Sequence, residues 1–186
     1  MNQDERERLL TLLKTKSYRA GQVVLSSGKV SDFYVDCKQT SLSAEGALLC
    51  GRLLFRLIVK HFPEARAVGG PTLGADPLVS VVAVISMIEG HPLDAFIIRK
   101  EPKEHGTAAW IEGMANLPEG HPVVLLEDVI TTGGSTLRSI QRVVEAKLKV
   151  LGVCVLLDRN EGGKEAIEAK GIPCLSLYNR SDFVAL

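Results

Sequence analysis

The chain has 186 residues, of which 46% are hydrophobic and 24% are charged, as in an ordinary globular protein with one full core. Lys and Arg together number 22, which equals the number of Asp and Glu, so the formal net charge is zero. This balance excludes a bulk electrostatic attraction to nucleic acid or to an acidic membrane surface. Any anion site must therefore come from locally clustered basic side chains.

The cysteines show neither a disulfide framework nor the spacing of a zinc site; they are Cys37, Cys50, Cys154 and Cys174. Cys154 and Cys174 lie in or beside apolar runs, so we expect them to be small buried side chains. This use of cysteine fits a reducing cytoplasm. The first residues, MNQDERERLL, lack the apolar core of a signal peptide, and the apolar run 77–88 is short for a membrane span. We therefore expect a cytoplasmic protein without a membrane segment.

Hydrophobic spacing and turn residues predict the elements in chain order. The N-terminal part is expected to hold an amphipathic helix at 4–16, a hairpin at 21–35 and a helix at 43–62 that Ser43 caps. The rest alternates between strands and helices: a strand at 66–68, a helix at 75–88, a strand at 95–99, a loop at 100–122, a strand at 122–126, a helix at 135–147, a strand at 150–157, a helix at 164–170 and a strand at 173–177.

This alternation predicts βαβ units and an α/β fold, with a parallel sheet covered by helices on both faces. The simplest organisation is a single domain over 1–186. Its N-terminal helix and hairpin occupy 1–40, and its α/β core occupies 43–180.

The most informative stretch is VVLLEDVITTGGST, residues 123–136. An apolar strand leads into two adjacent acids, Glu127 and Asp128, then into a turn of threonines, glycines and a serine, and then into a helix. Loops at the carboxyl ends of parallel strands bind ligands. Glycines let backbone N–H groups converge on an anion, and the N-terminus of the next helix favours the same anion. A ribose 5-phosphate suits both parts, because its vicinal hydroxyls match the acids and its phosphate matches the turn.

An ordinary strand-to-helix turn with solvated acids is the alternative interpretation. Neither the GxxxxGK[ST] motif of P-loop nucleotide sites nor the GxGxxG motif of dinucleotide sites occurs here. The order of strand, paired acids, hydroxyl side chains, glycines and helix favours the sugar phosphate.

Residues 123–136 resemble the signature with which type I phosphoribosyltransferases bind phosphoribosyl pyrophosphate (PRPP). The resemblance implies their fold, which has a central, mostly parallel sheet flanked by helices and a small N-terminal hood over the base. It also implies PRPP contacts from a run of consecutive residues: Glu127, Asp128, Val129, Ile130, Thr131, Thr132, Gly133, Gly134 and Ser135.

The segment RKEPKEHG, residues 99–106, places three cations and a histidine just after a strand. Its Pro and Gly make a helix improbable, so we expect a mobile loop. By itself the segment would be interpreted as a solvated charged loop. A diphosphate leaving group gives its cations a function, because the developing negative charge needs stabilisation and water must be kept out.

RKEPKEHG resembles the catalytic loop of orotate phosphoribosyltransferases. The resemblance implies PRPP contacts from four side chains: Arg99, Lys100, Lys103 and His105. It implies catalytic roles for Lys103 and His105, which would assist the departure of pyrophosphate, and for Arg99. It also implies a homodimer in which the loop 99–113 is shared across the interface.

Orotate carries a carboxylate that a guanidinium can bind through two hydrogen bonds. Arg159, which follows the strand 150–157, resembles the family's orotate-binding arginine, and Thr131 resembles a threonine that also contacts orotate. A salt bridge with Asp158 is the alternative for Arg159. The segment 25–38 resembles the hairpin over the base, where Phe33 and Tyr34 would contact orotate, with a core position as the alternative.

The implied activity is the transfer of a phosphoribosyl group from PRPP to orotate, giving orotidine 5'-monophosphate and pyrophosphate in UMP biosynthesis. Mg²⁺ is implied as a cofactor that PRPP itself mainly holds, without a protein metal site. Two departures are Ser26 and Leu73, where some relatives carry lysine. The alternatives are a purine phosphoribosyltransferase and a non-catalytic regulator that senses PRPP or nucleotides with the same fold.

Overall fold

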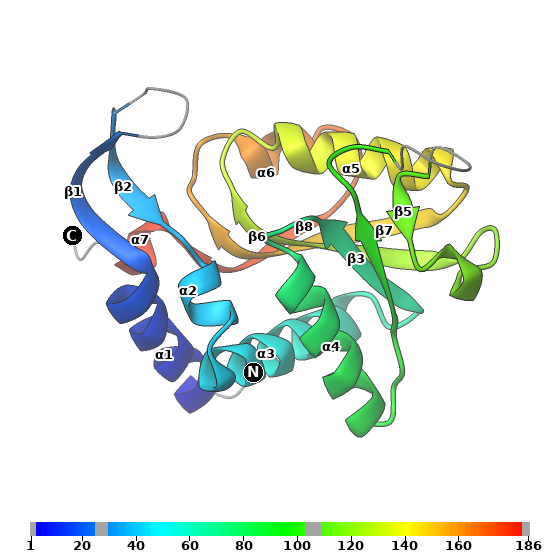
Figure 1. The fold of residues 1–186 in the computed structure, drawn as a ribbon, viewed down its shortest axis with the longest axis horizontal. Coiled ribbons are helices and arrows are strands. Elements are labelled where there is room, and N and C mark those ends of the chain that lie inside the picture. The colour runs from blue at the N-terminus through cyan, green and yellow to red at the C-terminus, as the bar shows by residue number, and fades with distance from the viewer. Residues whose placement is uncertain (1–2, 25–29, 103–108, 184–186) are drawn as a thin grey trace.

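A six-stranded sheet forms the centre of the computed structural model, which describes residues 3–24, 30–102 and 109–183 (Figure 1). The strand order is β5-β4-β3-β6-β7-β8, and all pairs are parallel except β4 with β5. The strands are β3 (Ala67–Pro71), β4 (Asp94–Ile98), β5 (Ile111–Glu112), β6 (Pro122–Ile130), β7 (Lys149–Asp158) and β8 (Cys174–Asn179). The predicted α/β class is therefore confirmed.

Helices cover both faces of the sheet (Figure 1). The helices α3 (Ala44–His61) and α4 (Asp76–Ile88) lie on one face, while α5 (Gly134–Glu145) and α6 (Gly163–Glu168) lie on the other. Each face buries its own apolar cluster, as expected for strands with buried residues on both sides. The carboxyl ends of the parallel strands consequently share one edge, where the loops that precede the helices gather.

The N-terminal part forms a separate layer beside the sheet. It contains α1 (Gln3–Leu12), a π-helical turn (Leu13–Ser17), an antiparallel hairpin and the one-turn helix α2 (Lys38–Ser41). The hairpin strands are β1 (Tyr18–Val24) and β2 (Val30–Val35). They confirm the predicted hairpin, whose Ser-Ser-Gly-Lys turn lies outside the described residues.

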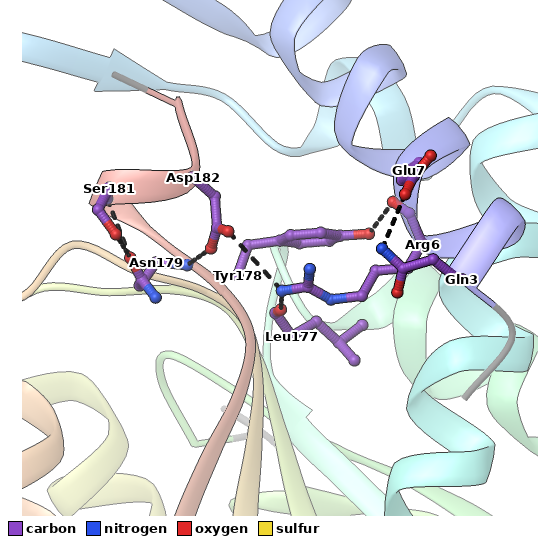
Figure 2. Close-up of polar contacts among 8 residues, drawn as sticks. All are labelled: Gln3, Arg6, Glu7, Leu177, Tyr178, Asn179, Ser181 and Asp182. Atoms are coloured by element: carbon purple, nitrogen blue, oxygen red, sulfur yellow. Dashed lines mark hydrogen bonds and ion pairs between the residues drawn. The ribbon is translucent and has the colours of Figure 1, made fainter. Parts of the chain in front are cut away.

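Arg6 of helix α1 contacts β8, the strand at the edge of the sheet (Figure 2). The guanidinium of Arg6 donates to the carbonyl oxygen of Leu177 at 2.7 Å and lies 4.9 Å from the centre of the Tyr178 ring. In return, the buried Tyr178 hydroxyl donates to the carbonyl oxygen of Arg6 at 2.7 Å. Asp182 of α7 (Arg180–Phe183) adds an ion pair with Arg6 at 3.8 Å. These contacts fix the N-terminal layer against β8 and so fix the position of the hairpin.

Two departures from the predicted elements concern the strands of the central sheet. Strand β6 continues four residues beyond the predicted end at Leu126, because β7 pairs with it as far as Ile130. The predicted loop 100–122 contains β5 and a 3₁₀ turn (Met114–Asn116), since β5 pairs with β4. The loop prediction was therefore wrong for these residues.

Two expectations about buried and apolar residues can also be compared with the structure. All four cysteines are free and buried, as expected for Cys154 and Cys174. No helix in the described part of the chain is long and apolar enough to span a membrane.

Candidate active site

A cavity of about 380 Å³ opens at the carboxyl edge of the sheet, between the ends of β3 and β6. Chain connections run from β3 toward β4 on one side and from β6 toward β7 on the other, so the strand order reverses here. Open α/β sheets bind ligands at such a point. The lining residues come from five separate segments: Lys38, Pro71, Thr72, Leu73, Gly74, Lys100, Glu127, Asp128 and Ser135.

The two predicted acids lie within β6 rather than after it, and both line the cavity. Strand β3 pairs with β6 only as far as Leu125, so the edge of β6 beyond that residue is open toward the cavity. Glu127 is buried, and its Oε2 accepts a hydrogen bond from the hydroxyl of Thr136 at 2.8 Å. Asp128 is half-buried, and its Oδ1 accepts from the Val129 amide at 2.9 Å. Both carboxyl groups thus border the cavity, Glu127 held by Thr136 of α5 and Asp128 packed against Gly74.

The turn 131–133 connects β6 to α5, as the phosphate-site prediction requires. Gly133 has φ 78°, a left-handed conformation that favours glycine. Gly163 packs so closely below the turn that a Cβ there would overlap the carbonyl oxygen of Thr131. Ser135 lines the cavity, and the side chain of Ile130 is buried in the core. Any contact of Ile130 with a sugar phosphate would therefore use its backbone.

A second loop, residues 72–74, lines the same cavity as the two acids. The Thr72 hydroxyl donates to Oδ2 of Asp76 at 2.8 Å, which attaches the loop to the first turn of α4. A Cβ on Gly74 would overlap the carboxylate of Asp128, so only glycine permits this close approach. Leu73 is 71% exposed and lines the cavity, so an apolar side chain lies beside its polar groups.

The basic segment begins beside the cavity. Lys100 lines it, while Arg99 lies in the adjoining hollow and forms a 3.0 Å ion pair with Glu112. The carbonyl oxygen of Arg99 accepts from Arg142 of α5 at 2.7 Å, and the guanidinium of Arg142 stacks 3.6 Å from the centre of the Trp110 ring. Arg99 and Trp110 are thus both attached to α5. The other two predicted residues of this segment, Lys103 and His105, lie outside the described residues.

Arg159 follows β7 at the same edge of the sheet and is buried. Its guanidinium pairs with Glu161 at 2.8 Å, while Asp158 accepts from the amide of Asn160 at 2.9 Å. Asp158, the alternative partner of Arg159, thus accepts a hydrogen bond from the backbone, and the guanidinium of Arg159 pairs with Glu161.

The ring of Phe33 is fully buried and lies 5.8 Å from the guanidinium carbon of Arg159. It also packs against Tyr18 and Phe183, which agrees with the interpretation of Phe33 as a core aromatic. Its ring supports Arg159, and orotate contact by its backbone stays a prediction. Tyr34 is half-buried, and its contact with orotate likewise stays a prediction.

The chain is similar in sequence to a known family of enzymes. A family model described as the phosphoribosyl transferase domain matches residues 51–179. Orotate phosphoribosyltransferases from Sorangium cellulosum and Thermosynechococcus vestitus are 48% and 50% identical, and the matches cover 97% and 98% of this chain and 93% and 94% of the relatives. The chain belongs to the orotate phosphoribosyltransferase family.

A solved structure of a family member has the same fold as this chain. The Mycobacterium tuberculosis orotate phosphoribosyltransferase, crystallised with PRPP, is 31% identical and has a TM-score of 0.78. The similarity covers 99% of this chain and 94% of that chain. The type I phosphoribosyltransferase fold expected from the sequence is therefore confirmed, with its sheet and helices arranged as in the family.

The roles of two residues in this orotate phosphoribosyltransferase family member could not be predicted from the sequence. Lys38 lines the cavity from α2, a helix of one turn that no periodic pattern could show. Thr136 holds Glu127, although the sequence marked it only as one hydroxyl of the turn. The available signal for Thr136 was its position in the first turn of α5, two residues after Gly134.

The Glu127 carboxyl gives the ligand-free protein a specific pH dependence. Burial raises its pKa from 4.5 to about 8, the Thr136 hydrogen bond acts in the opposite direction, and the Asp128 carboxyl raises it further. The folded state therefore keeps a proton that the unfolded state releases. The contribution of this group to the free energy of unfolding is complete below pH 4.5 and is lost as the pH rises to about 8.

We expect Glu127→Gln, which cannot ionise, to lack this loss. Urea unfolding without ligand at pH values from 5 to 9 should show the variant gaining stability relative to the unmodified chain as the pH rises. Glu119→Gln, an exposed surface change, serves as the control and should run parallel to the unmodified chain. Parallel curves for Glu127→Gln would contradict the raised pKa.

Proposed function

We propose that this chain transfers the phosphoribosyl group of PRPP to orotate, releasing pyrophosphate and forming orotidine 5'-monophosphate. The observation that carries the proposal is the cavity where Glu127 and Asp128 lie between the turn 131–135 and the loop 72–74. The acids accept hydrogen bonds from the ribose hydroxyls, and the turn binds the 5-phosphate through its N–H groups and hydroxyls. The loop 72–74 borders the diphosphate.

In the reaction, the bond between C1 of the ribose and the diphosphate oxygen breaks with its electrons leaving on pyrophosphate. A ring nitrogen of orotate then bonds to C1 from the opposite face, and the proton that this nitrogen loses is taken up by pyrophosphate or solvent. The protein contributes orientation, charge stabilisation and exclusion of water rather than a covalent nucleophile. Arg159 binds the carboxylate of orotate, with Thr131 nearby, while Lys100 and the predicted Lys103 and His105 stabilise the departing pyrophosphate.

We infer that Mg²⁺ enters mainly with PRPP. Mg²⁺ prefers oxygen ligands and retains several waters, and it is often held by one or two carboxylates together with substrate phosphates. In the residues that the structure describes, no group of three or more His, Cys, Asp or Glu side chains could enclose a metal. Asp128 supplies a carboxylate at the cavity and is the residue that would complete the shell. When bound, the ion neutralises part of the diphosphate charge.

We also propose a homodimer in which the segment 99–113 is shared with the partner. Support comes from a face of large apolar side chains that remain exposed on α4 and the residues beside it. This face comprises Leu42, Leu73, Val84, Met87 and Ile88, which are 58% to 72% exposed. Exposed apolar faces of this kind mark protein interfaces. Part of the face, Leu42 and Leu73, borders a small hollow with Lys38, adjacent to the cavity.

The activity is tested with the purified chain, PRPP and Mg²⁺, by measuring pyrophosphate release with orotate, hypoxanthine and adenine in parallel. We expect release with orotate alone. Activity only with a purine would establish the purine phosphoribosyltransferase instead. A chain that binds PRPP but turns over none of the bases would be the non-catalytic regulator.

The dimer is tested by sedimentation velocity on Val84→Glu, which places a charge in the middle of the apolar face. We expect the unmodified chain to sediment as a dimer and the variant as a monomer with strongly reduced turnover. Val144 is 56% exposed on α5, on the other face of the sheet, so Val144→Glu is the matched control and should remain a dimer with normal turnover. An unmodified chain that is monomeric and fully active would contradict both the dimer and the shared segment.

A further inference from the structure

Lys38 is held at the cavity by the residues around it. Its ammonium lies 2.7 Å from Oδ1 of Asp36, and its backbone amide donates to the same oxygen at 3.2 Å. The short helix that carries it is fixed from below, since the buried Thr40 hydroxyl lies 2.7 Å from that of Ser17. Lys38 therefore has a defined position although α2 has only one turn.

Acidic and basic side chains are balanced among the described residues that line the cavity. Among the described residues that line it, Glu127 and Asp128 are acidic, while Lys38 and Lys100 are basic. The loop 72–74 borders the cavity with Leu73, which carries no charge. A diphosphate binds where cations compensate its charge. Lys38 lies beside Leu73 of this loop, since both line the cavity and the adjacent hollow, while Lys100 lies beside Thr72 at the other end of the loop.

The Asp36 carboxylate keeps other hydrogen-bond donors when the ammonium of Lys38 moves away from it. Asp36 keeps the amide of Lys38 and the side-chain amide of Gln39, whose Nε2 lies 3.1 Å from Oδ2. The Lys38 side chain is 40% exposed, so it has room to turn. A lysine whose only role were to neutralise Asp36 would not need to line the cavity.

We propose that Lys38 is a binding residue for the reaction, whose ammonium contacts the diphosphate of PRPP beside the loop 72–74. This inference rests on the proposed function, since it assigns a further residue to the same PRPP site. Asp36 acts as a positioning residue that holds the ammonium toward the cavity until the diphosphate arrives.

Calorimetric titration of the full chain with inorganic pyrophosphate and Mg²⁺ tests the contact directly. For Lys38→Gln we expect pyrophosphate affinity to fall about 10- to 100-fold, the loss of one charge-assisted hydrogen bond. The KM for PRPP should rise with it, while the KM for orotate changes less than about twofold. Lys38→Arg, which keeps the charge, should recover most of the affinity.

Lys147→Gln is the matched control, because Lys147 is also ion-paired, with Glu119 at 3.1 Å, but precedes β7 at the opposite edge of the sheet. It should bind pyrophosphate normally. Thermal unfolding is recorded for every variant, and Lys38→Met, which keeps the aliphatic stem, replaces Lys38→Gln if that variant does not fold.

Unchanged pyrophosphate affinity in a folded Lys38→Gln or Lys38→Met protein would overturn the inference. Equal rises in the KM for PRPP and for orotate, without a change in pyrophosphate binding, would assign Lys38 a structural role and would also overturn it. These outcomes leave the proposed function intact. Failure of the unmodified chain to turn over orotate would instead refute that function, while the pyrophosphate titration would still report on Lys38.

Discussion

Gly74→Ala should reduce kcat/KM for PRPP by about 100-fold or more. The added Cβ would overlap the carboxylate of Asp128, so either this acid or the loop 72–74 must move. Both are proposed to contact PRPP, and a displacement of about 1 Å at such a site can cost about 100-fold in rate. Steady-state kinetics with varied PRPP measure the effect.

Gly120→Ala is the control for Gly74→Ala. Gly120 has φ 79° and open space around its Cα, so alanine there is strained but meets no neighbour. It should cost about 1 kcal/mol of stability without changing kcat/KM. Normal kinetics in a folded Gly74→Ala protein would show that the approach of the loop to Asp128 is irrelevant to PRPP.

Arg159→Ala should raise the KM for orotate about 100-fold with little change in the KM for PRPP. Removing the guanidinium deletes a bidentate, charge-assisted contact with the orotate carboxylate. Each hydrogen bond to a charged group contributes about 1.5–3 kcal/mol, which corresponds to a factor of about 10 to 100. Arg159→Lys should restore only part of the affinity, since an ammonium lacks the planar fork. Initial rates with varied orotate at saturating PRPP provide the measurement.

Arg8→Ala removes another ion-paired arginine, one that contacts Glu45 at the exposed surface of α1, and should leave both KM values unchanged. The assignment of Arg159 would be refuted by an unaltered KM for orotate. A parallel rise in the KM for PRPP would point to a collapse of the packing between Arg159 and Phe33 instead.

Elements with local signals could be predicted from the sequence. Ser43 caps α3 as expected, because its Oγ accepts the amide of Gly46 within the same turn. The turn between β6 and α5 was recognisable because its glycines, hydroxyls and acids are adjacent in the chain. The position of this turn at the carboxyl end of a parallel strand followed from the alternation of strands and helices, while the central place of β6 in the sheet came from the structure.

Features that depend on distant partners could not be predicted. The polar residues Glu127 and Asp128 look like the end of a strand, but β7 pairs with β6 beyond them. The core position of Phe33 depends on Phe183, which is 150 residues away in the chain and packs against its ring at 5.7 Å. Lys38 reaches the cavity because Ser17 fixes α2 across 23 residues. Each of these requires a contact that no local pattern contains.

A crystal structure of the chain with orotidine 5'-monophosphate tests the central claim most directly. We expect the ribose hydroxyls to lie about 3 Å from the carboxylates of Glu127 and Asp128. The 5'-phosphate should be bound by the turn 131–135. A nucleotide bound elsewhere, with both acids far from any ribose and no phosphate at the turn, would contradict the account.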